Sequence, residues 1–104
     1  METLLNHSIT ERKFTMANYM MFRHKVKDFA IWKRGYDAHR AARDAAGLSE
    51  KYVLQGADNP NEVIGFLEAA DLGRAKAFAE SQELKDTMQK VSVTDKPDIY
   101  FLTA

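Results

Sequence analysis

Two histidines and the aromatic residues near them are the side chains of this sequence best suited to chemistry. His24 lies in a segment of alternating apolar residues, and His39 follows two aromatic residues at helical spacing. Because imidazole titrates near neutral pH, His24 and His39 are the candidate catalytic bases. The candidate substrate-binding residues are Trp32, Tyr36, Phe22 and Phe66. This set favours removal of a proton from a planar organic molecule held among aromatic rings.

Each of these side chains also has a structural interpretation. His24 could be a hydrogen-bonded histidine of the core or of an interface, and His39 could stabilise a helix end. Trp32 and Tyr36 hide large areas and need one polar partner each, so packing is the first expectation for Trp32. His39 also lies about one helical turn from Tyr36 and Arg43, which allows a polar cluster at a pocket mouth. These residues leave open whether the chain is an enzyme.

Composition excludes several classes of function. The chain has no cysteine, which excludes disulfides and thiolate nucleophiles and is compatible with the cytoplasm. His7, His24 and His39 are widely spaced, so we expect no metal. We also expect no cofactor. Fifteen basic residues balance fifteen acidic ones, so we expect no nucleic-acid partner. No run of residues is long enough to cross a membrane.

Length and hydropathy predict one folded domain. A chain of 104 residues, 45% of them hydrophobic, builds one core. Residues 1–17 have no clear period and lack the apolar core of a signal peptide, so we expect an N-terminal tail there. The domain is expected to span residues 18–104.

The first predicted elements are a strand over 18–26 and a single amphipathic helix over 28–47. Asp28 is a suitable N-cap, Gly35 a weak point, and Gly47 suits the left-handed conformation that ends a helix. Alternate strand residues lie on opposite faces and both faces carry apolar groups, with Met20, Phe22, His24 and Val26 on one face and Tyr19, Met21, Arg23 and Lys25 on the other.

The second half of the sequence predicts a hairpin, a broken helix and a last strand. The hairpin strands are expected over 48–56 and 62–70, around a cluster of turn-forming residues. Asp71 is expected to cap a helix that breaks near Ser81, which caps a shorter one. The last strand follows Pro97 over 98–102. Arg23 and Glu68 are expected to form an ion pair.

This order of elements predicts a four-stranded antiparallel sheet with the helices on one face. The other face is then uncovered and too apolar for water. Covering it with the same face of a second copy is the natural solution, so we expect a homodimer.

Several segments resemble the dimeric α+β barrel superfamily, in particular proteins related to the antibiotic biosynthesis monooxygenases. They are Val26–Phe29 with Trp32, Ala46–Leu48, Asp58–Val63, and Phe78–Ser81 with Leu84 and Met88. The resemblance covers nearly all of residues 18–102. It implies a ferredoxin-like βαββαβ subunit, a barrel formed by two copies, and a pocket between sheet and helices in which Trp32, Tyr36 and His39 orient a planar compound.

The resemblance implies a cofactor-independent, monooxygenase-like enzyme as the leading hypothesis. One alternative is a non-catalytic module that binds a small ligand or a protein. Another is haem binding or haem degradation, because the superfamily includes haem-degrading enzymes. Those members carry an asparagine in the middle of the first strand, whereas this chain has Phe22, Arg23 and His24 there and Asn18 only near its start.

Overall fold

The computed structural model describes residues 17–90 and 93–104, so residues 1–16 of the predicted tail lie outside the described residues. The elements follow one another as β1 (Asn18–Lys25), α2 (Phe29–Ala38), α3 (Arg40–Ala45), β2 (Leu48–Gln55), β3 (Glu62–Ala69), α4 (Leu72–Ala79), α5 (Gln82–Lys90) and β4 (Asp98–Thr103). Among the described helices, none is long and apolar enough to span a membrane.

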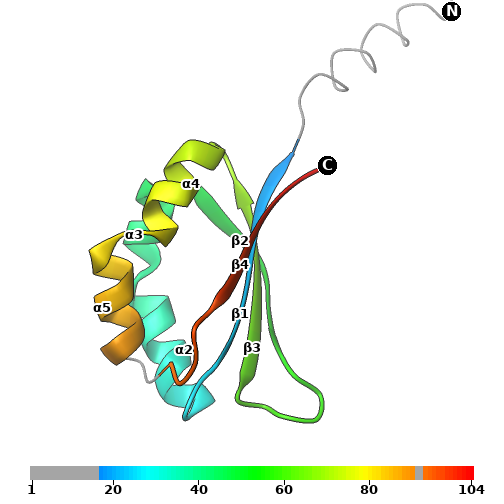
Figure 1. Cartoon of the computed structure of the whole chain (residues 1–104), viewed down its shortest axis with the longest axis vertical. Helices are drawn as coiled ribbons and strands as arrows, with labels where there is room; N and C mark the ends of the chain where they lie inside the picture. The colour runs from blue at the N-terminus through cyan, green and yellow to red at the C-terminus, as the bar shows by residue number, and fades with distance from the viewer. Residues whose placement is uncertain (1–16, 91–92) are drawn as a thin grey trace, which may run out of the picture.

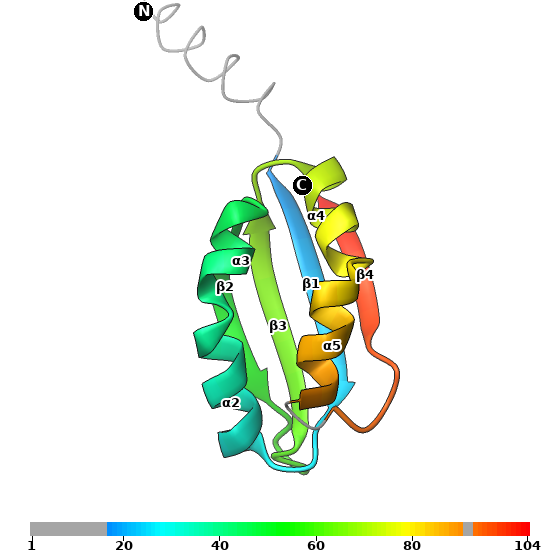
Figure 2. The ribbon, with the colours of Figure 1, turned by 90° about the vertical axis from the view of Figure 1, so that its left-hand side faces the viewer.

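The four strands form one antiparallel sheet in the order β2-β3-β1-β4. All described helices cover the same face of this sheet (Figure 1). The α2–α3 pair lies over β2 and β3, and the α4–α5 pair lies over β1 and β4 (Figure 2). The predicted ferredoxin-like α+β fold is therefore confirmed.

Three side chains cap helices where the sequence predicts caps. The Asp28 carboxylate accepts the N–H of Ile31 at 3.1 Å, and the Asp71 carboxylate accepts the N–H of Arg74 at 3.0 Å. The Ser81 hydroxyl accepts the N–H of Leu84 at 3.1 Å and separates α4 from α5. These bonds satisfy N–H groups that the first helical turn leaves free.

The first helix is not continuous, which corrects the prediction of one helix over 28–47. It breaks at His39 rather than at Gly35. The carbonyl oxygen of Tyr36 accepts the N–H of His39 at 3.1 Å and a guanidinium N–H of Arg43 at 2.5 Å. In an uninterrupted helix this carbonyl would instead accept the backbone N–H of Arg40, four residues later. Gly47 ends the second segment with φ of 77°, as predicted.

The core lies between the helices and the inner face of the sheet. Met20, Phe22 and His24 of β1 face the helices and are buried, together with Val63 and Leu67 of β3. A register shift between Glu50 and Tyr52 reverses the alternation of β2, so that Val53 rather than Tyr52 lies on the inner face. The alternation predicted for β1 is thus confirmed, whereas the reversal in β2 was not foreseen.

The outer face of the sheet is uncovered in the single chain and largely apolar. We call it the open face; it carries Tyr19, Met21, Tyr52, Leu54, Ile64, Phe66, Tyr100 and Leu102. At one end of it Arg23 binds Glu62 at 2.6 Å and Asp98 at 3.3 Å. Glu68 instead pairs with Lys51 at 3.1 Å. The predicted Arg23–Glu68 pair is wrong, because the register places Glu68 opposite Tyr19.

Candidate functional site

A cavity lies between the inner face of the sheet and the two helix pairs, α2–α3 and α4–α5. Its volume is about 70 Å³, less than the roughly 150 Å³ of a cavity that holds benzene. Its walls come from β1, β3 and β4 and from all four described helices. The lining residues are Met20, Phe22, His24, Trp32, Tyr36, His39, Arg43, Leu67, Phe78, Leu84, Thr87, Met88, Pro97 and Ile99.

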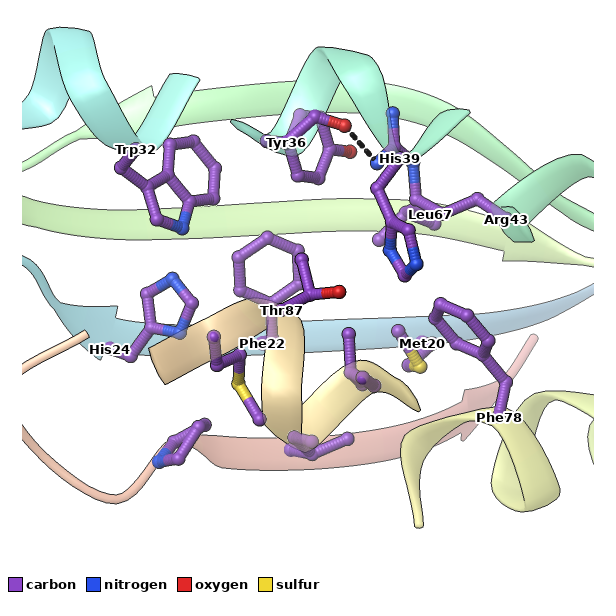
Figure 3. Close-up of a pocket in the computed structure, with 14 residues that line it drawn as sticks. Met20, Phe22, His24, Trp32, Tyr36, His39, Arg43, Leu67, Phe78 and Thr87 are labelled. Atoms are coloured by element: carbon purple, nitrogen blue, oxygen red, sulfur yellow. Dashed lines mark hydrogen bonds between the residues drawn. The ribbon is translucent and has the colours of Figure 1, made fainter. Parts of the chain in front are cut away.

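Aromatic rings form most of one wall. Trp32 and Tyr36, one helical turn apart on α2, stack with ring centroids 4.8 Å apart. The rings of both point toward Phe22 of β1, whose centroid lies 6.2 Å from each (Figure 3). The cavity is therefore a predominantly apolar space between flat surfaces, suited to a planar molecule.

The position of Phe22 depends on the absence of a side chain at Gly65. A Cβ atom on Gly65, directly opposite on β3, would lie 2.0 Å from the Phe22 ring. The ring therefore occupies the space that a side chain at Gly65 would fill. Gly65 thus helps to keep the cavity open.

Four polar atoms around the cavity are buried and have no hydrogen-bond partner among the described residues. They are both ring nitrogens of His24, the hydroxyl of Tyr36 and Nε2 of His39. A buried polar group without a partner costs about 1–3 kcal/mol, so such groups call for an explanation. A ligand with oxygen atoms that donate and accept hydrogen bonds would satisfy them.

His24 is a neutral imidazole at physiological pH. Burial lowers its pKa from 6.5 to about 4, an effect that Asp95 opposes and Arg23 reinforces. The Trp32 ring meets it edge-on, with centroids 5.5 Å apart. A neutral imidazole carries one donor and one acceptor, so His24 can bind a substrate oxygen in either direction but is a weak base.

Tyr36 is a protonated phenol for the same physical reason. Burial raises the pKa of Tyr36; the nearby Arg43 guanidinium lowers it and Glu50 raises it further. The guanidinium carbon of Arg43 lies 3.6 Å from the centre of the Tyr36 ring. Tyr36 therefore keeps a hydroxyl proton that it can donate.

His39 lies at the break between α2 and α3. Figure 3 shows its ring directed into the cavity beside Phe78, whose centroid is 5.9 Å away. Its Nε2 atom lies 3.9 Å from a carboxylate oxygen of Glu83 on α5.

The structure brings five of the six predicted site residues together. His24, His39, Trp32, Tyr36 and Phe22 all line the cavity. Phe66 does not: it lies on the open face and stacks on Tyr19 at 4.9 Å, which corrects its assignment to the pocket. Among the described residues, no group of three or more potential ligands could hold a metal ion.

Sequence reasoning missed the contribution of α5. Leu84, Thr87 and Met88 close one side of the cavity. Their spacing of three and four residues marks one face of a helix, but it cannot indicate which surface that face covers. Arg43 was noted only as a neighbour of His39, although it is buried and lines the cavity.

Comparison with known proteins gives solved structures but no sequence relatives. No family model and no curated protein matches the chain. A structure assigned to the antibiotic biosynthesis monooxygenases from Bordetella bronchiseptica matches with a TM-score of 0.70 at 12% identity, over 85% of this chain and 96% of that one. One with the same assignment from Caulobacter crescentus gives 0.66 at 14%, over 92% and 97%.

A NipSnap family protein of unknown function from Agrobacterium tumefaciens is also similar, with a TM-score of 0.61 at 9% identity, over 85% of this chain and 87% of that one. Identities this low show the fold alone. The chain therefore has the ferredoxin-like α+β fold of the structures assigned to the antibiotic biosynthesis monooxygenases.

Proposed function

We propose that the cavity binds a planar phenolic or keto compound and that the protein oxidises it with molecular oxygen, without a cofactor. The observation that carries this proposal is the set of unpartnered polar atoms around an aromatic cavity: both nitrogens of His24, the Tyr36 hydroxyl and Nε2 of His39. Hydroxyl and carbonyl oxygens of a ring compound are the groups that would satisfy them. The fold shared with structures assigned as monooxygenases supports the same class of chemistry.

The histidines take different roles in this proposal. His39 is the base, because its ring is directed into the cavity and its Nε2 atom has no hydrogen-bond partner among the described residues. His24 is the hydrogen-bonding group, because its pKa of about 4 keeps it neutral. Tyr36 donates to the oxygen that gains negative charge, and the apolar walls exclude water from the resulting anion.

The reaction needs no further redox partner. His39 removes a proton from an acidic CH₂ group, and the carbanion gives one electron to oxygen. The radical and superoxide then combine into a carbon-bound peroxide, which takes up the proton. Loss of water converts the CH₂ group to a carbonyl. One substrate and one O₂ thus give one ketone and one H₂O.

The cavity must expand to admit a ring, since it is smaller than one that holds benzene. The movable wall is α5, which has no buried residue and faces the cavity with half-buried side chains, including Leu84 and Met88. Unbranched Met88 can change rotamer at little cost. Substrate entry between α5 and the α2–α3 layer requires no change in the sheet.

Oxygen uptake with a series of anthrone-type compounds, which carry such a CH₂ group, tests the proposal. Under ¹⁸O₂ we expect one labelled oxygen atom in the product. His39→Gln should lower the rate about 100-fold, the lower end of the range for a general base. Arg40→Gln, on an exposed side chain of α3, is the matched control and should keep the wild-type rate. Ligand binding without oxygen uptake would instead identify a non-catalytic binding module.

We also propose that two copies pair through their open faces. The exposed fractions of Tyr52, Leu54 and Tyr100 are 61%, 52% and 50%. Apolar surface of this extent on both edge strands is costly in water, and a second copy supplies a matching surface. In such a pair each cavity stays within one chain, because it lies on the opposite side of the sheet.

A further inference from the structure

Arg43 is a buried cation whose charge no described side chain neutralises. Its exposed fraction is 8%, and no carboxylate of the described residues lies within ion-pair distance of it. The neighbouring cations are paired: Lys33 with Asp37 at 2.7 Å and Arg40 with Asp44 at 3.7 Å. A buried charge normally has a partner of opposite sign.

The contacts within the chain use only part of the guanidinium. One N–H donates to the carbonyl of Tyr36, and the flat face covers the Tyr36 ring at 3.6 Å. A guanidinium has five N–H donors. None of the nitrogens of Arg43 is both fully enclosed and without a partner, so its remaining donors face open space.

Arg43 forms part of the wall between the cavity and an outer cleft. Arg43 lines the cavity together with Tyr36 and His39, and it also lines a polar cleft along β2 with Glu50 and Ser49. The Glu50 carboxylate acts on the nearby Tyr36 hydroxyl but does not lie within ion-pair distance of Arg43, and Glu50 is exposed, so solvent screens its charge. The enclosed cation therefore determines which charge is favoured at this end of the cavity.

We infer that Arg43 is a specificity residue and that the ligand of the cavity carries a carboxylate or an equivalent anionic oxygen at the Tyr36 end. This inference rests on the proposed function only in using the same cavity, since it needs binding and not turnover. A carboxylate can take two parallel hydrogen bonds from a guanidinium, which an uncharged amide cannot match. Neutral ring compounds without this group would bind weakly.

The test compares two probes of the same shape, 4-hydroxybenzoate and 4-hydroxybenzamide. Trp32 is the one tryptophan of the chain and lines the cavity, so its indole N–H resonance reports occupancy in either case. We expect the carboxylate to bind at least about tenfold more tightly than the amide. Equal affinities for wild-type protein would overturn the inference, and so would no binding of either probe.

Variants locate the preference at Arg43. Arg43→Gln should abolish the difference between the probes, Arg43→Lys should restore part of it, and Glu50→Gln should increase it. Arg40→Gln, whose side chain is 79% exposed, should leave it unchanged. Circular dichroism shows which variants are folded. If Arg43→Gln does not fold, the second measurement is Arg43→Lys: a preference smaller than that of the wild type, with Arg40→Gln unaffected, supports the inference, and a preference equal to that of the wild type overturns it. A preference that survives in folded Arg43→Gln would overturn the inference, whereas absence of oxygen uptake would overturn only the proposed reaction.

Discussion

His24 is a buried histidine without a hydrogen-bond partner among the described residues, and this state affects both binding and stability. Its exposed fraction is 4%, and both of its nitrogens lie near the cavity. The unfolded chain can protonate this imidazole freely, whereas the folded chain resists protonation until about pH 4. His24 therefore contributes less to the free energy of unfolding than an apolar ring would at this position. Such a cost is expected of a group kept for binding a ligand.

The pH dependence of stability should reveal this histidine. Because its pKa falls from 6.5 to about 4 on folding, the unfolded state binds more protons between these values. The His24 contribution is fully present above pH 6.5 and is lost as the pH falls toward 4, by on the order of 3 kcal/mol.

The measurement is urea unfolding of wild type and His24→Phe at pH 7, 6, 5 and 4.5. We expect the variant to lose less stability than wild type as the pH falls. Carboxylates titrate in both proteins, so the difference between the two curves isolates the histidine. Curves that stay parallel would contradict a depressed pKa at His24.

At the scale of the elements, the cavity depends on how β3 and α5 limit the space around Phe22. Gly65 lets the Phe22 ring lie against the β3 backbone, and α5 covers the opposite side. The sheet wall is rigid because paired strands hold it on both sides. The α5 wall is less constrained, since it has no buried residue.

Gly65→Ala should close the cavity from the sheet side. The new Cβ atom would meet the Phe22 ring at 2.0 Å and force it toward Trp32. We expect a loss of about 1–3 kcal/mol in the free energy of unfolding. We also expect no shift of the Trp32 indole N–H resonance when 4-hydroxybenzoate is added.

Gly73→Ala in α4 is the matched control, because its Cβ would meet only a carboxylate oxygen of Asp71 at 3.1 Å. Its stability should stay at or slightly above that of wild type, as helix propensity predicts. Adding Phe22→Leu to Gly65→Ala should recover stability. Failure of that rescue would argue against the Phe22 contact as the cause.

Hydrogen exchange should separate α5 from the rest of the helical layer. We expect the amides of α5 to exchange faster than those of α2, which buries Trp32 and Tyr36, because few buried contacts oppose local opening. Saturating ligand should slow exchange in α5 more than in α4. Equal slowing of both helices would contradict a local role for α5.

At the scale of the whole molecule, the two faces of the sheet differ in what covers them. The inner face holds the core and the cavity, whereas the open face presents tyrosines and leucines to the solvent in the single chain. A domain of about 100 residues hides a limited share of its surface, so pairing through the open face adds burial that one chain lacks.

Light scattering on two matched lysine substitutions tests this pairing. Tyr100→Lys on the open face should raise the dimer dissociation constant at least about tenfold, because a buried lysine lacks a partner there. Ile31→Lys changes a residue of similar exposure, 43%, on the helical side and should stay dimeric. A wild-type monomer at micromolar concentration would contradict the proposed dimer.

The fold and much of the site follow from local patterns. The alternation in β1 assigns Phe22 and His24 to one face, and helical spacing aligns Trp32 with Tyr36 on one side of α2. The residues Asp28, Asp71 and Ser81 mark helix starts because their side chains bond to amides only three positions away. Such short-range effects can be predicted without knowledge of the fold.

Sequence alone determined the order of elements, the division of the β1 residues between two faces and the aromatic and imidazole groups available for chemistry. Tertiary structure alone decided that Phe66 lies on the open face, that the helix breaks at His39, that α5 closes the cavity and that Arg43 is buried without a described acidic partner. These features depend on strand register and on contacts between residues far apart in the chain. Burial, which shifts the pKa of His24, is likewise a property of the assembled core and of no single segment.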